Sequence, residues 1–126
     1  MAGVSRLTTE KNVWVCTVRA DGRPHLTPAW FVYEAETFWI CLNGTSVKNR
    51  NASHHPTVSL SLEDGNTPVV AEGSVKVHER PYPDWVVSAF FDKFGWNITR
   101  DDADDGAYDV LWELPVQRWL MGTPEE

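Results

Sequence analysis

The residues best suited to binding chemistry are two basic side chains in the middle of the chain. Lys48 and Arg50 are the only Lys or Arg residues between Arg23 and Lys76, in a protein of 126 residues with a net charge of −7. Two cations concentrated in this way in an acidic protein favour an anionic ligand. Lysine offers phosphate a point charge and arginine a planar set of donors, so the pair suits a phosphate group. An exposed, charged helix without a ligand is the alternative interpretation.

A helix start is expected directly before these two bases. Thr45 and Ser46 are of the residue types that cap helices, and the predicted helix runs to about Ser53. A helix start offers free backbone N–H groups and the positive end of the helix dipole. Hydroxyls, N–H groups and the two bases together predict a phosphate-binding cradle.

A strand interrupted by prolines is the second candidate segment. Pro24 and Pro28 lack the N–H that a sheet requires, so neighbouring polar backbone groups remain free to bind the edge of a flat ring. Trp30 and Phe31 would present aromatic surface on opposite faces of this strand. His25 is suited to orienting a substrate or donating a hydrogen bond. For His25 and Trp30, ordinary packing without a ligand is the alternative.

The elements that must position these segments are mostly short strands. Apolar, β-branched and alternating runs predict strands over residues 13–19, 24–33, 37–42, 58–62, 68–79, 108–114 and 116–121. Two helices are expected, at residues 45–53 and 83–94. Since helices do not alternate with strands, we predict a mainly β fold, a single domain over residues 1–126. It would be an antiparallel barrel of about six or seven strands with two short helices.

Several local details of this outline can be tested. Asp21-Gly22 between two extended runs predicts a hairpin with a type I′ turn. Gly73 predicts a bend or bulge in its strand, and Pro115 is expected to separate the last two strands. The aspartate-rich residues 97–106 are predicted to form a solvated loop.

Composition excludes several classes of protein. The acidic charge argues against non-specific nucleic-acid binding and against docking on anionic membranes. No apolar run approaches the roughly 18 residues that span a bilayer, and the N-terminus lacks a signal-peptide layout, so a cytoplasmic location is expected. Cys16 and Cys41 form no CxxC motif and favour a reducing compartment. The four histidines lack the spacing of a helical metal site, so no metal is expected.

Aromatic residues are unusually frequent. Seven tryptophans occur in this short chain: Trp14, Trp30, Trp39, Trp85, Trp96, Trp112 and Trp119. Core packing accounts for many of them. So many indoles in a small domain also indicate an aromatic ligand pocket or a large apolar dimer interface.

As a set, these motifs resemble a family, the flavin- and deazaflavin-binding split β-barrel oxidoreductases related to pyridoxamine 5′-phosphate oxidase. The motifs are Asp21-Gly22-Arg23-Pro24-His25, then Pro28-Ala29-Trp30-Phe31-Val32, then Ser46-x-Lys48-x-Arg50-Asn51, then Pro56-x-Val58-Ser59-Leu60. They lie in the right order and spacing, and the resemblance covers about residues 8–77. Further along the chain the match holds only in outline.

The resemblance implies a homodimeric split barrel with FMN or the deazaflavin coenzyme F(420) at the interface. Residues expected to bind the cofactor phosphate are Lys48 and Arg50, helped by Thr45, Ser46 and Asn51. Residues expected to line the cofactor ring are Thr27, Pro28, Ala29, Trp30 and Phe31. Trp112 or Trp119 would supply contacts from the partner chain. His25 is the one catalytic candidate, since hydride chemistry resides in the cofactor.

The implied activity is that of an oxidoreductase that transfers hydride to a planar, conjugated small molecule. The full pyridoxal-phosphate contact set of the true oxidases is not recognisable and the chain is shorter than theirs, so oxidation of vitamin B6 is not expected. The alternative is a non-catalytic module that binds flavin, haem or another tetrapyrrole on the same fold. A structural dimer that has lost its cofactor is a third option.

Overall fold

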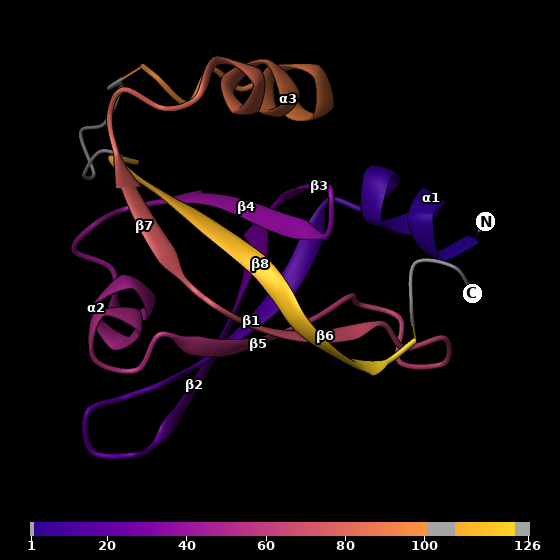
Figure 1. The fold of residues 1–126 in the computed structure, drawn as a ribbon, viewed down its shortest axis with the longest axis vertical. Helices are drawn as coiled ribbons and strands as arrows, with labels where there is room; N and C mark the ends of the chain where they lie inside the picture. The colour runs from indigo at the N-terminus through magenta and orange to yellow at the C-terminus, as the bar shows by residue number, and fades with distance from the viewer. Residues whose placement is uncertain (1, 101–107, 123–126) are drawn as a thin grey trace.

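The computed structural model describes residues 2–100 and 108–122. Its strands run in the order β2-β1-β5-β6-β8-β4-β3, with β7 beside β8 (Figure 1). The strands are β1 (Asn12–Val18), β2 (Pro24–Trp30), β3 (Val32–Glu34), β4 (Thr37–Leu42), β5 (Thr57–Ser61), β6 (Val70–Ser74), β7 (Lys76–Glu79) and β8 (Val110–Met121). The helices are α1 (Ala2–Thr9), α2 (Val47–His54) and α3 (Asp84–Phe94).

The long strand β8 joins the two halves of the barrel. Its residues 110–115 pair with β4, residues 110–113 also pair with β7, and residues 116–121 pair with β6. Figure 1 shows β8 crossing the molecule diagonally between these partners. All strand pairs are antiparallel. The predicted mainly β, antiparallel split barrel is therefore confirmed.

Two apolar clusters hold the described residues together. The first fills the barrel and includes Val15, Phe38 and Trp112. The second lies between α3 and the other face of β4 and β8, where Trp39 and Phe90 are buried. Strand alternation produces both clusters, because successive residues of β4 point to opposite faces. The helix α3 ends at Gly95 as predicted, in the left-handed conformation (φ 66°).

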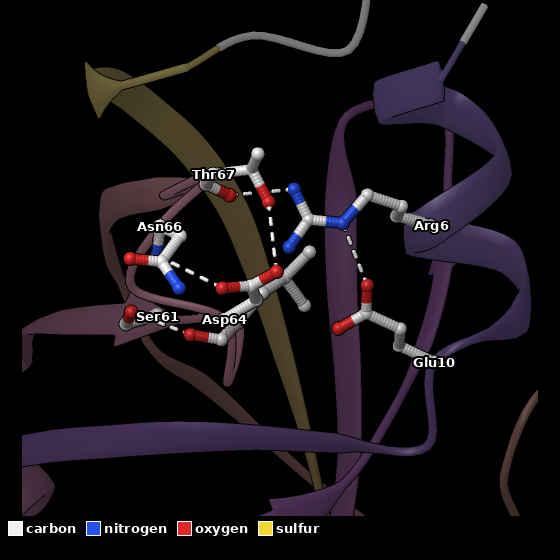
Figure 2. A network of polar contacts seen from close by, with 7 residues as sticks. Arg6, Glu10, Ser61, Asp64, Asn66 and Thr67 are labelled. Carbon is white, nitrogen blue, oxygen red and sulfur yellow. Dashed lines mark hydrogen bonds and ion pairs between the residues drawn. The ribbon is translucent and has the colours of Figure 1, made fainter.

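The prediction of two helices and about six or seven strands was incomplete, because α1 was not expected. An isolated helix of eight residues is marginal in water, so its own sequence carries little signal. Tertiary contacts stabilise it: Leu7 is fully buried in the barrel core. The Arg6 guanidinium binds the Glu10 carboxylate at 2.7 Å and donates to the Thr67 carbonyl at 2.6 Å (Figure 2).

The prediction that Pro115 separates two strands was wrong, because β8 runs through it. Pro115 lies opposite Thr37, the first residue of β4, where that ladder ends. The missing N–H therefore interrupts no central pairing. The pairing with β6 shifts register between Glu72 and Gly73, as expected of a bulge there, but the extra residue is Gln117 of β8 and does not lie in the strand of Gly73. A Cβ on Gly73 would clash with the Pro115 carbonyl oxygen, so glycine lets the two strands approach.

The prediction of a type I′ turn at Asp21-Gly22 was also wrong. Gly22 alone has a positive φ there (92°), and the Arg19 and Arg23 backbones close a three-residue loop by a hydrogen bond of 2.9 Å. The type I′ conformation instead occurs between β3 and β4, where Ala35 and Glu36 have φ values of 51° and 55°. Two-residue hairpin loops favour primed turns, because the twist of these turns matches the twist of the flanking strands.

None of the helices in the described ranges is long and apolar enough to cross a membrane. The aspartate-rich segment predicted as a solvated loop falls largely on residues 101–107, outside the described residues.

Replacing Glu36 by glycine should stabilise the protein. The left-handed conformation disfavours an L side chain, so Glu36→Gly should raise the free energy of unfolding by about 1 kcal/mol. Gly22→Ala is the matched control. The added Cβ there meets no atom within 4 Å, so backbone strain alone should lower stability by a similar amount. Urea unfolding followed by tryptophan fluorescence measures both, and a less stable Glu36→Gly variant would contradict the prediction.

Candidate functional site

A cavity of about 610 Å³ lies where the ends of several elements meet. It is bounded by the end of β2, the end of β4, the first turn of α2 and the residues that follow α3. The lining residues are Asn12, Pro28, Ala29, Trp30, Cys41, Leu42, Lys48, Phe94, Gly95, Trp96 and Tyr108. Its walls are mostly apolar or aromatic, with few polar groups, as is usual for a small-molecule site.

One wall of the cavity is a chain of aromatic rings. Trp30 stacks on Phe94 with centroids 4.5 Å apart and planes 5° apart. Trp96 meets Trp30 edge-on at 5.9 Å and Tyr108 edge-on at 5.2 Å. Trp30 is nevertheless 45% exposed, so part of its indole is available to another ring. This wall suits a flat, conjugated ligand.

The cation of the cavity is Lys48. Its ammonium donates to the Thr27 hydroxyl at 3.2 Å, and burial lowers its pKa. Each lining residue other than Lys48 is uncharged. A half-buried ammonium whose bond goes to a neutral hydroxyl favours an anionic ligand, because an anion would offset the cost of burying the charge.

Buried polar contacts hold α2, and therefore Lys48, in place. The Asn51 amide donates to the Thr17 hydroxyl at 3.0 Å, and both side chains are buried. The Trp112 indole donates to the Asn49 side-chain oxygen at 2.9 Å. Ser46 caps the helix start as predicted, because its hydroxyl accepts the Asn49 N–H.

Two further basic groups stand near Lys48. His25 lies two residues before Thr27 on the same face of β2, and its Nδ1 atom is buried without a hydrogen-bond partner. Burial lowers the pKa of His25, and the nearby charges of Arg19 and Lys48 lower it further. The charges of Arg19 and Lys48 thus both act on His25.

The structure brings together several residues predicted to bind a cofactor. Pro28, Ala29, Trp30 and Lys48 line the cavity, and Thr27 binds Lys48.

Other residues predicted for the site lie elsewhere. Phe31 lies between β2 and β3 and is fully buried in the barrel core. Arg50 is exposed, because residues two apart on a helix point about 200° apart. The Thr45 hydroxyl donates to the Asn43 side chain, and Asn51 bonds to Thr17 inside the barrel.

Of the two tryptophans predicted as alternatives for a contact with a partner chain, Trp112 is excluded by its burial, and Trp119 stays a prediction. Trp112 is fully buried in the barrel, opposite Ile40 of β4. Trp119 is half-buried and packs against the same core.

Sequence reasoning missed the wall that follows α3. Phe94 was predicted in the helix over residues 83–94 and Tyr108 in the strand over residues 108–114, while Trp96 was assigned to no element. None of them was connected to Trp30. The aromatic pair around the helix-ending Gly95 was the available signal. The contacts of Phe94 and Trp96 with Trp30 could not be predicted, because more than 60 residues separate them along the chain.

Lys93 ties the last turn of α3 to the junction of β2 and β3. Its ammonium donates to the Phe31 carbonyl at 2.9 Å and lies 3.9 Å from the centroid of the Phe31 ring. Burial lowers the pKa of Lys93 to about 8. Because Phe94 follows it directly, this contact helps position the aromatic wall.

The stability of the protein should rise with pH through the titration of Lys93. Between about pH 8 and its ordinary pKa of 10.5, the ammonium is charged in the unfolded chain and neutral in the folded one. Unfolding then takes up a proton, so raising the pH stabilises the fold. Urea unfolding of wild type and Lys93→Met from pH 7 to 9 isolates this effect.

We expect the difference between wild type and Lys93→Met to grow in favour of wild type as the pH rises. Burial raises the pKa of Cys41 and of Tyr82 to about 12, which acts in the opposite direction above pH 9 in both proteins. A difference that does not change with pH would contradict the assignment.

Within the ranges that the structure describes, no three His, Cys, Asp or Glu side chains come together as metal ligands. A mainly β split barrel with an aromatic, cationic cavity at its rim defines the class of this protein. The profile of the pyridoxamine 5′-phosphate oxidase family matches residues 4–121, so the chain belongs to that family.

Solved structures share the fold. An F(420) reductase is 21% identical, with a TM-score of 0.72 over 91% of this chain and 93% of that chain. HutZ, the heme storage protein from Vibrio cholerae, is 21% identical, with a TM-score of 0.74 over 96% and 95%. A conserved hypothetical protein from Mycobacterium tuberculosis is 23% identical, with a TM-score of 0.70 over 92% and 79%. No curated protein sequence matches the chain.

Proposed function

We propose that this protein is an oxidoreductase that binds FMN or the deazaflavin coenzyme F(420) in the cavity described above. The observation that carries the proposal is Lys48, a half-buried cation at the edge of an aromatic cavity. Family membership and the shared fold of an F(420) reductase support it. The acceptor would be a planar, conjugated small molecule, because the walls suit flat rings.

The residues of the chain fit such a cofactor in two parts. Lys48 would bind the phosphate, and Thr27 would keep the ammonium oriented toward it. Trp30, stacked on Phe94, would face the ring system. The backbone near Pro28, where the ladder lacks an N–H donor, would meet the polar edge of the ring.

The cofactor supplies hydride transfer, and the protein supplies position and shielding. No acid–base group is required for this division of labour, although His25 stands close to Lys48. The mostly uncharged walls of the cavity would exclude water from the reacting face.

We further propose that two copies of the chain form a dimer that closes the cavity. Trp14, Leu26 and Trp30 share the outer face of β1 and β2, and they are 38%, 59% and 45% exposed. The outer edge of β2 carries no strand in the described residues. Because Trp30 belongs to both this face and the cavity, a second copy docked here would complete the site.

A non-catalytic haem or tetrapyrrole carrier is the second candidate, since HutZ shares the fold and a porphyrin is also flat and anionic. The cavity lining contains no histidine or methionine to ligate iron. Its thiol, Cys41, interacts with the Tyr108 carbonyl, and burial raises its pKa to about 12. Apart from the phenol of Tyr108, the lining therefore offers no group that commonly ligates haem iron, and a haem titration should give no Soret shift typical of histidine or methionine ligation.

Removing Lys48 should weaken cofactor binding strongly. Losing one charge-assisted contact costs roughly 1.5–3 kcal/mol, so Lys48→Ala should lower the affinity for FMN or F(420) about 10- to 150-fold. Arg50→Ala is the matched control, since Arg50 is exposed on the other side of α2 and should have a smaller effect. Quenching of tryptophan fluorescence on titration with each cofactor gives the affinities. Equal affinities for wild type and Lys48→Ala would refute the phosphate assignment.

A charge on the outer face should separate the proposed dimer. Leu26→Glu places a carboxylate on the outer face of β1 and β2, opposite Cys16. The core is not disturbed, because Leu26 is 59% exposed. We expect a monomer by light scattering and weaker cofactor binding. Val77→Glu is the control, since Val77 is 47% exposed on β7. A Leu26→Glu variant with the mass and affinity of wild type would rule out this interface.

A further inference from the structure

Two cations from separate parts of the fold, Arg19 and Lys48, act electrostatically on His25. The β1–β2 register places Thr17 opposite His25. Arg19 directly follows the end of β1, and its charge acts on His25. Lys48 reaches Thr27 from α2, one alternation further along β2. His25 therefore stands near both an arginine and a lysine.

No carboxylate acts on His25 or Lys48 among the described residues, whereas the Arg19 charge also acts on the exposed Asp21 carboxylate. The His25 Nδ1 atom is buried without a partner, and the charges that act on His25 are Arg19 and Lys48. Lys48 donates to a neutral hydroxyl. In contrast, Arg23 on the same hairpin pairs with Asp21 at 2.8 Å. The arrangement costs electrostatic free energy that a bound anion would offset.

We propose that His25 takes up a proton when the anion site is occupied and binds phosphate as an imidazolium cation. In this form His25 selects a phosphate that carries two negative charges. This inference rests on the proposed function, which assigns a cofactor phosphate to Lys48. The proton comes from solvent, and no bond other than N–H is formed. His25 thus acts as a specificity-determining residue.

Electrostatics determines the direction of the effect. In the free protein, burial and the two neighbouring cations lower the pKa of His25, so the imidazole is neutral at pH 7.5. The groups around it are Thr17 and Arg19 from β1, Lys48 from α2, and Thr27 on β2 itself. A dianion beside these cations reverses the local potential and raises the pKa of His25. Binding therefore takes up a proton, and affinity increases as the pH falls.

The charge on the phosphate decides how large this effect is. FMN ends in a phosphate monoester with a charge near −2 at neutral pH, whereas the phosphate of F(420) is a diester with a single charge. A dianion compensates three cations better than a monoanion does. The proton uptake should thus be larger for a monoester than for a diester.

The first test is calorimetry of FMN binding at pH 7.5 in two buffers of different ionisation enthalpy. Wild type should take up part of one proton, and His25→Gln should take up less and bind FMN about tenfold more weakly. Arg23→Gln, whose parent residue is paired with Asp21, should behave as wild type. The second ionisation of the phosphate, near pH 6, is common to all variants. Equal uptake in wild type and His25→Gln would overturn the inference and leave the proposed function standing.

The second test requires neither the cofactor nor a variant. The imidazole resonances of His25 are titrated by NMR with methyl phosphate and with dimethyl phosphate. Methyl phosphate should raise the pKa of His25 more than dimethyl phosphate does. This result without binding of FMN or F(420) would support the anion site and refute the proposed cofactor. No shift with either compound would overturn the inference, even if a cofactor binds.

Discussion

One buried hydrogen bond positions the candidate site. Thr17 and Asn51 are the buried polar residues of the described chain, and they bind each other at 3.0 Å. Leaving either unpaired would cost about 1–3 kcal/mol, so α2 is strongly favoured in one orientation over β1. Lys48 lies one turn before Asn51 on the same face of the helix, and this orientation directs it at Thr27. The cation of the cavity is thus placed by a contact inside the barrel.

The rest of the site follows from strand alternation and from β8. The inner positions of β2 place His25 and Thr27 toward α2, while Trp30 lies on the outer face. The β4–β8 pairing buries Trp39 on its outer side and gives α3 a surface to cover. Because α3 packs on this surface, its last residue, Phe94, stacks on Trp30. The cavity therefore has a cationic end at Lys48 of α2 and an aromatic end where α3 packs near Trp30.

Local chemistry in the sequence was enough to predict most strand positions, the capped helix α2 and the end of α3 at Gly95. The predicted strands over residues 24–33 and 68–79 are each divided in two, and the last two predicted strands form one. Features that depend on distant partners were not predictable. The helix α1 depends on Leu7 in the barrel core, and the turn at Glu36 depends on the twist of a two-residue hairpin loop. Of the two bases predicted to bind phosphate, Lys48 lines the cavity and Arg50 does not. The sequence alone does not distinguish them, because the direction of each side chain depends on how the helix packs. The aromatic wall that follows α3, which includes Trp96, could be identified only from the fold.

Net charge and local charge act at different distances in this protein. The chain carries −7 overall, yet the described charges that act on His25 are both positive. Salt largely screens the interaction of His25 with carboxylates that lie farther away than about one Debye length. Partly buried neighbours are screened much less. Burial lowers the pKa of both His25 and Lys48, so the free site disfavours its own charged form. An anion removes that penalty, which makes the charge of the ligand, more than the size of the cavity, the basis of selection at this end of the site.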